Sequence, residues 1–239
     1  MSQVQKEYRN WIKSKDLVSF EVLKGETNLL ISAERNLTIQ AETLTQECRR
    51  MIEDYIKIYP QFKDSLRPME TSGVAAQAVE KMLAASRLAN VGPMAAVAGS
   101  VAEYVGKGLL NFSSEIIVEN GGDIFIKSSQ DRIVGIYAGR SLLSGKVNLK
   151  ISKAQFPLGI CTSSGKIGHS LSFGKADSVT VISDSAALAD AAATAIGNII
   201  KTPADISRAI DRAKAIKGVK GIVIIVGEKL AAWGEIEIA

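Results

Sequence analysis

The sequence predicts an α+β fold, with helices packed on a predominantly antiparallel or mixed sheet. Segments with strand-like alternation and segments with helical periodicity are interspersed along the 239 residues. Most strand segments are separated by short connections, which suit antiparallel neighbours because parallel strands need a long crossover. No linker or internal repeat divides the chain, so we expect a single domain over 1–239, with 1–16 as a candidate flexible N-terminal extension.

The N-terminal half is expected to contain two strands and three helices. Residues 17–32, LVSFEVLKGETNLLIS, alternate apolar and polar side chains around a glycine turn. Apolar residues recur at three- and four-residue steps over 36–59, which predicts a helix that buries Cys48 and ends before a proline. The segments 73–89 and 93–110, rich in Ala and Gly, predict two further helices.

Short strands dominate the rest of the chain. Strand-like alternation with turn residues between the segments is found at 114–129, 132–139, 146–152, 157–162 and 178–183. Helices are expected at 184–200 and 203–215, and GIVIIVGEKLAAWGEIEI (221–238) predicts a strand, a turn and an edge strand.

Composition indicates an ordinary globular protein, with 46% hydrophobic and 23% charged residues. The net charge is +4, but the densest basic segment, 201–220, is typical of a solvated helix face, so no nucleic-acid partner is expected. Two distant cysteines and one histidine do not form a zinc pattern. The polar start lacks a signal-peptide core, and the aliphatic run 222–226 is too short to span a bilayer. We therefore expect a cytoplasmic protein without a membrane partner.

The segment NVGPMAAVAGSVAEYVGKG offers a first candidate ligand site. Gly92, Gly99 and Gly106 recur every seven residues and so share one helix stripe, where a backbone or a flat ligand can approach closely. The seven-residue spacing by itself favours tight helix–sheet packing over a ligand site. Pro93 suits a first helical turn, whose free N–H groups can hold a phosphate, so Gly92 and Pro93 are candidate cofactor-binding residues.

A second candidate is the glycine turn of ENGGDIF. It consists of Asn120, Gly121, Gly122 and Asp123, in which the glycines permit positive φ and outward-facing amides. A plain hairpin turn explains the same pattern without a ligand.

The predicted helix at 184–200 places two oxygen ligands on one face. Asp190 and Thr194 are four residues apart and lie one turn from each other. Their carboxylate and hydroxyl oxygens suit Mg²⁺, with water or phosphate completing the coordination shell. Ser183 or Asp184 is expected to cap this helix. An alanine-rich packing helix with one stray aspartate is the alternative.

The segment 159–179, GICTSSGKIGHSLSFGKADSV, contains the only histidine of the chain. It is compatible with a phosphate cradle, a nucleophile site or a surface turn. His169 is a candidate general acid or base, and Cys161 is a candidate nucleophile if its thiol is activated. The hydroxyl side chains that follow the cysteine are candidate cofactor-binding residues: Thr162, Ser163 and Ser164.

Taken in order, GPMAAVAG, NGGDI, CTSSG and SVTVISDSAALADAAATA resemble the ApbE superfamily of flavin transferases, which move FMN from FAD to a protein threonine with magnesium. The chain is similar in particular to a smaller ApbE-related branch, through VGPMAAVAG, VENGGDI and CTSSGKIGHSLSFGKAD, over residues 17–200. The resemblance implies an ApbE-like fold, FAD or a similar nucleotide-type pyrophosphate ligand, and Mg²⁺ at Asp190 and Thr194.

Two positions depart from the transferase pattern. Ala96 stands where the transferases carry a lysine in LGGIAKG, and HSLSFGKA lacks the Asp-Pro and Thr-Gly that follow their catalytic histidine. These departures favour ligand binding over flavin transfer. The alternatives are a sulfur- or acyl-handling enzyme that uses Cys161, or a non-catalytic binding module on the same scaffold. The glycine stripe leaves homo-oligomer formation open.

Overall fold

Eight antiparallel strands form one continuous sheet in the computed structural model of the chain, which describes residues 14, 16–70, 73–165 and 174–239. The strand order is β1-β2-β3-β4-β7-β8-β9-β10. The strands are β1 (Val18–Lys24), β2 (Thr27–Ala33), β3 (Ile116–Asn120), β4 (Asp123–Lys127), β7 (Leu158–Ser163), β8 (Ser178–Ser183), β9 (Val219–Val226) and β10 (Lys229–Gly234). The expected α+β class with an antiparallel sheet is confirmed.

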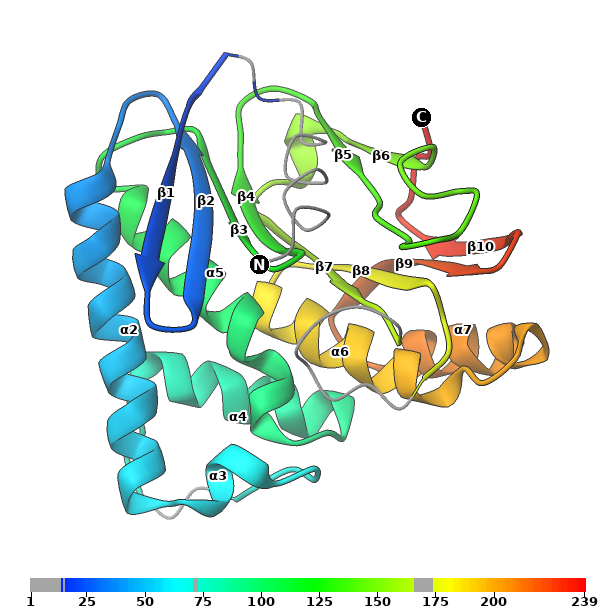
Figure 1. Cartoon of the computed structure of the whole chain (residues 1–239), viewed down its shortest axis with the longest axis horizontal. Coiled ribbons are helices and arrows are strands. Elements are labelled where there is room, and N and C mark those ends of the chain that lie inside the picture. Colours follow the sequence, from blue (N-terminus) through cyan, green and yellow to red (C-terminus); the bar gives the residue numbers. More distant parts are fainter. Residues whose placement is uncertain (1–13, 15, 71–72, 166–173) are drawn as a thin grey trace.

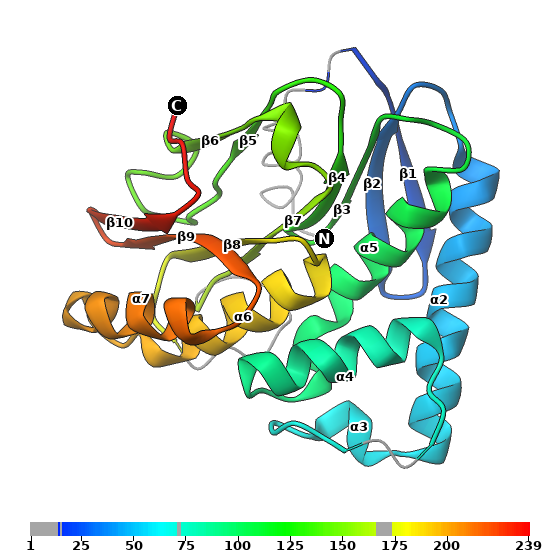
Figure 2. The same cartoon turned by 180° about the vertical axis from the view of Figure 1, so that it is seen from behind.

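The long helices lie together on one face of this sheet (Figures 1 and 2). α5 packs on β3 and β4, α6 packs on β7 and β8, and α7 packs on β9. α2 contacts β1 and α5, while α4 contacts both α5 and α6. The helices are α2 (Thr38–Ile58), α3 (Gln61–Asp64), α4 (Gln77–Ala89), α5 (Val97–Leu109), α6 (Ala186–Ile199) and α7 (Ile206–Ala215), with short 3₁₀ segments η2 (Pro93–Ala96), η3 (Lys153–Gln155) and η4 (Pro203–Asp205). In the part of the chain described here, none of these helices combines the length and the apolar character needed to cross a membrane.

A small two-stranded sheet, β5 (Arg132–Gly135) with β6 (Asn148–Ile151), lies on the opposite side of the main sheet (Figure 1). The main sheet therefore has a hydrophobic core on each face. Phe125 and Val181 are buried on the helix side, whereas Ile126 and Leu149 are buried on the side of β5 and β6. Alternation along β4 explains this division, because Phe125 and Ile126 point to opposite faces.

Three local expectations are wrong in detail. The helix predicted over 93–110 is divided, because Ala96 leaves helical geometry (φ −115°, ψ 7°) between η2 and α5. Pro93 consequently opens a four-residue 3₁₀ segment and not the first turn of the α-helix. The helix expected from residue 73 begins at Gln77. Ser185, and neither of its two predecessors, caps α6 by accepting a hydrogen bond from the Leu188 amide.

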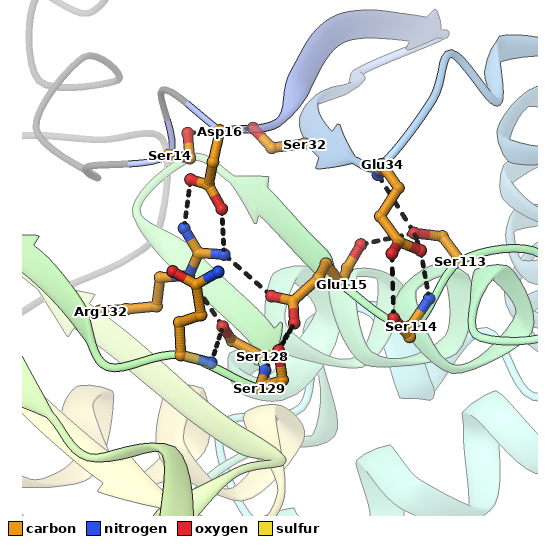
Figure 3. A network of polar contacts seen from close by, with 11 residues as sticks. Ser14, Asp16, Ser32, Glu34, Ser113, Ser114, Glu115, Ser128, Ser129 and Arg132 are labelled. Atoms are coloured by element: carbon orange, nitrogen blue, oxygen red, sulfur yellow. Dashed lines mark hydrogen bonds and ion pairs between the residues drawn. The ribbon is translucent and has the colours of Figure 1, made fainter.

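A buried arginine connects β5 to the chain preceding β1 (Figure 3). The guanidinium of Arg132, which is 3% exposed, donates to both carboxylate oxygens of Asp16, at 2.6 and 2.8 Å, and to Glu115 at 2.8 Å. Its Nε donates to Ser128 at 2.8 Å. Glu115 also accepts a hydrogen bond from the Ser129 amide at 2.6 Å. The buried guanidinium is therefore ion-paired with two carboxylates and hydrogen-bonded to a hydroxyl.

Candidate functional site

The carboxylate of Asp190, on α6, lies at the N-terminal end of α5. Its Oδ2 accepts a hydrogen bond from the Gly99 amide at 2.9 Å, and the Ala98 amide also donates to this carboxylate. The first amides of an α-helix have no partner within the helix, and the helix dipole favours negative charge there. A protein carboxylate thus occupies the first-turn amides that a phosphate would use.

In turn, a carboxylate from α5 lies at the N-terminal end of α6. Glu103, which lies on α5 and is 3% exposed, accepts hydrogen bonds through Oε2 from the Ser185 hydroxyl at 2.8 Å and the Ala187 amide at 3.3 Å. Its Oε1 pairs with Lys107 at 2.6 Å. Burial opposes ionisation of Glu103, but these partners outweigh it and lower its pKa. Each of the two helices is therefore capped by a carboxylate of the other.

β4 and β7 bring Asp123 and Cys161 to directly paired positions, close to Asp190. Burial raises the pKa of Asp123 well above its ordinary value, and the negative charge of Asp190 raises it further. Burial also raises the pKa of Asp190 to about 7, against the amides of Gly99 and Ala98 that stabilise its charged form. Two carboxyl groups that share a buried location disfavour one another's ionisation, and a cation between them would relieve this.

The glycine turn is a hairpin between β3 and β4, as expected. Gly121 and Gly122 have φ of +67° and +104°, which side-chain-bearing residues rarely adopt. A Cβ on Gly121 would meet nothing within 4 Å, and one on Gly122 would come no closer than 3.7 Å, to the Thr162 carbonyl. Asn120 donates to the Ala98 carbonyl at 3.1 Å. The turn thus leaves open space beside the end of β7 and is tied to the start of α5.

The hydroxyl residues lie on two sides of this region. Thr194 is buried one turn after Asp190 on α6. The hydroxyls of Thr162 and Thr180 are 2.9 Å apart across β7 and β8. Ser163 lies against the C-terminal part of α6, and Ser164 is also partly buried.

The glycine stripe is filled by the protein itself. A Cβ on Gly92 would lie 1.7 Å from the Ser65 carbonyl oxygen, one on Gly99 would lie 2.2 Å from the Ala186 carbonyl oxygen, and one on Gly106 would lie 2.1 Å from the ring of Phe125. The three glycines are therefore close-packing positions, but they do not share one helix, because Gly92 precedes η2 whereas Gly99 and Gly106 lie on α5. Gly92 and Pro93 are both buried.

Cys161 lies within strand β7, in agreement with the strand expected over 157–162. Its thiol is completely buried and donates to the Ala186 carbonyl at 3.3 Å. Burial, together with the negative charges of Asp123 and Asp190, raises the pKa of Cys161 well above its ordinary value, which disfavours the thiolate. Cys48 is likewise free and buried on α2. His169 lies outside the described residues.

Sequence reasoning missed Glu103 and Glu119. Glu119 is 2% exposed, accepts a hydrogen bond from the Gly122 amide at 2.7 Å, and adds negative charge near Asp123. Its place immediately before the glycine turn was a usable signal. Among the residues that the structure describes, no set of three or more His, Cys, Asp or Glu side chains is arranged to hold a metal ion.

Solved structures with this fold include ApbE proteins. The flavin transferase ApbE from Vibrio cholerae superposes with a TM-score of 0.54 at 12% identity, covering 91% of this chain and 96% of that one. An ApbE protein from Thermotoga maritima superposes with a TM-score of 0.56 at 13% identity, covering 92% and 96%. At these identities, the likeness establishes an ApbE-like fold.

Sequence comparison places the chain in a particular family. A family model described as "AbpE bacteria" matches residues 9–232, and the chain belongs to this family. A UPF0280 protein of Methanococcus aeolicus is 38% identical over 220 residues, covering 90% of this chain and 88% of that protein. A UPF0280 protein of Methanocaldococcus jannaschii is 39% identical over 232 residues, covering 95% and 92%. The ApbE-related branch that the motifs predict is confirmed.

Proposed function

We propose that the chain binds a flavin nucleotide, or a similar pyrophosphate ligand, together with Mg²⁺. The observation that carries the proposal is the buried carboxyl pair of Asp123 and Asp190, each with a raised pKa. A divalent cation would neutralise the excess negative charge of this pair. Mg²⁺ usually takes one or two carboxylates and completes its shell with water and ligand phosphates, so it does not need a cage of three protein ligands.

The proposed ligands of the ion are Asp190 and Thr194, one turn apart on α6. Bound there, Mg²⁺ would stabilise negative charge on the pyrophosphate. The hairpin residues Asn120 to Asp123 would line the ligand from one side, where the turn leaves open space. The end of β7, with Thr162, Ser163 and Ser164, would line it from the other side, and His169 is proposed as the acid or base.

Binding without flavin transfer is the form of the proposal that we prefer. Ala96, which stands at the position of the transferases' lysine, is fully buried and supplies no charge. The alternative that gives Cys161 the lead is weakened by the burial and the raised pKa of its thiol.

Calorimetric titration of the full-length protein with FAD, with and without Mg²⁺, tests the proposal. We expect saturable binding that weakens about tenfold or more, or about 1.4 kcal/mol, when Mg²⁺ is removed. Asp190→Asn and Thr194→Val should weaken the Mg²⁺-dependent part. Asp184→Asn is the matched control, because that carboxylate is exposed before α6 and pairs with Lys220. Absence of FAD, FMN or ADP binding up to about 1 mM would contradict the proposal.

Transfer of FMN from FAD releases AMP, whereas binding alone leaves FAD intact, so AMP release distinguishes the two activities. Mass spectrometry of the protein, FAD, Mg²⁺ and a threonine-containing acceptor peptide would detect AMP together with a flavinylated peptide if transfer occurs. We expect bound, intact FAD and an unmodified peptide.

A further inference from the structure

A pocket of about 250 Å³ lies between α2, α4 and α5, apart from the cluster around Asp190. Its polar lining comes from Gln77 and Lys81 on α4 and from α5, which contributes Ser100, Glu103, Tyr104 and Lys107. Leu44 of α2 supplies an apolar wall. None of the residues that we assign to the nucleotide and the metal lines this pocket.

Ser100 is the feature that points to a ligand. It is 3% exposed, it lines the pocket, and its hydroxyl has no hydrogen-bond partner among the described residues. A buried hydroxyl without a partner costs about 1–3 kcal/mol, so native proteins rarely retain one. A group bound in the pocket would provide the missing partner.

The charges of the pocket favour an anion. Lys107 forms an ion pair with Glu103 at 2.6 Å, so these two charges balance each other. The other carboxylate oxygen of Glu103 accepts hydrogen bonds from Ser185 and Ala187. Both oxygens of Glu103 are therefore already occupied. Tyr104 forms a hydrogen bond with Glu47, and burial, followed by that negative charge, raises its pKa, so its hydroxyl stays neutral.

Lys81 supplies the other positive charge of the pocket lining. It is exposed on α4 and makes no ion pair within 14, 16–70, 73–165 and 174–239. An ammonium group and a buried hydroxyl at one pocket are donors suited to a single oxyanion.

We infer that this pocket binds the carboxylate or phosphate group of a small molecule, through Lys81 and Ser100. Pockets for ligands of drug size enclose about 300–1,000 Å³, so one of this size takes a small acid and not a whole dinucleotide. The apolar side chain of Leu44 accommodates a short carbon chain next to the anionic group. This site is separate from the proposed nucleotide site, and it does not depend on Mg²⁺.

Titration of the full-length protein, without Mg²⁺, with inorganic phosphate and separately with butyrate tests the inference. We expect saturable binding of at least one probe, weakened about tenfold or more by Ser100→Ala and by Lys81→Gln. The probe that binds identifies the anion as phosphate or carboxylate. Arg87→Gln removes a positive charge from the same helix outside this pocket and should bind the probes as the wild type does.

Thermal unfolding of Ser100→Ala separates a ligand-binding hydroxyl from a structural one. Without ligand, the variant should melt at or above the wild-type temperature, because it loses an unpaired buried polar group. A lower melting temperature would overturn the inference. So would the absence of saturable binding by both probes up to about 10 mM, or equal binding by Ser100→Ala, Lys81→Gln and the wild type.

Discussion

Gly99 and Asp190 are in direct contact: the amide of Gly99 donates to Oδ2 of Asp190 at 2.9 Å, and their helices meet where residue 99 has no side chain. A Cβ at this position would lie 2.8 Å from the Cβ of Asp190 and 2.2 Å from the carbonyl oxygen of Ala186. The close approach places a carboxylate on the N-terminal end of α5 and, through Ala186, sets the position of α6.

Gly99→Ala should therefore destabilise the protein and disturb the proposed metal site. The added methyl meets the backbone of α6, which cannot rotate away as a side chain can, so we expect a loss of about 2–3 kcal/mol in the free energy of unfolding. Urea unfolding measures the loss, and FAD titration with Mg²⁺ should show weaker binding.

Gly108→Ala is the matched control on the same helix. Its Cβ would meet the end of the Leu44 side chain at 2.6 Å, which is flexible, and alanine gains about 1 kcal/mol of helix propensity over glycine. The control should lose much less stability than Gly99→Ala. Equal losses would show that contact with α6 is not the cause.

Asp123→Asn should stabilise the ligand-free protein at neutral pH. The pKa of Asp123 is raised in the folded state, so the folded protein keeps a proton that the unfolded chain releases above about pH 3.8. Wild-type stability should therefore fall as the pH rises from there toward neutrality, and the amide removes this dependence. We expect the melting temperature at pH 7 in EDTA to rise by about 2–4 °C for each kcal/mol regained.

Below pH 3.8, wild type and Asp123→Asn should have similar melting temperatures, because the carboxyl is protonated in both states. With Mg²⁺ and FAD the order should reverse, since the variant lacks one of the two negative charges that the cation neutralises. A variant that melts below the wild type at pH 7 in EDTA would contradict the account of a strained carboxyl pair.

The sequence predicted those features whose signals are local. Strand alternation and glycine turns predicted the two hairpins, including Gly121 and Gly122, and helical periodicity located the main helices. Motif resemblance selected Asp123 and Asp190, which the fold brings close together. The reciprocal capping was not predictable, because Asp190 and its partner Gly99 are 91 residues apart.

Two side-chain environments that sequence reasoning did not foresee have the same physical origin. Glu103 and Lys107 are spaced as a surface ion pair, yet Glu103 is buried because α6 packs over it. Cys161 lies in a segment rich in serine and glycine, yet it belongs to a central strand covered by α6. In both cases tertiary packing determines the environment of a side chain whose sequence neighbours are polar.

Neither cysteine should react in the native protein. Burial raises the pKa of Cys48 to about 12, and burial with two nearby carboxylates raises the pKa of Cys161 well above its ordinary value. Iodoacetamide labelling between pH 6 and 9 should therefore be slower than that of a free model thiol at both sites, and rapid only after denaturation. Peptide mapping by mass spectrometry resolves the two. Fast native labelling at Cys161, retained in Cys48→Ala, would revive the thiol-based alternative.

Acid should destabilise the protein through Glu115, which pairs with the buried Arg132 (Figure 3). Burial opposes the charge of Glu115, but hydrogen bonds from Ser129, Ser128 and Arg132 outweigh it and lower its pKa from 4.5 to about 2. A lowered pKa stabilises the fold above pH 4.5, and this contribution, about 3 kcal/mol, is lost as the pH falls from 4.5 to 2.

Glu115→Gln should lower stability at pH 7 and reduce the slope of stability against pH in that acid range, because glutamine cannot ionise. Denaturant unfolding at several pH values measures both effects. Glu34→Gln is the control: this exposed carboxylate also has a lowered pKa, owing to Ser114 and Ser113, but solvent screens it, so its removal should change little. Parallel acid profiles for wild type and Glu115→Gln would show that the charge of Glu115 does not support Arg132.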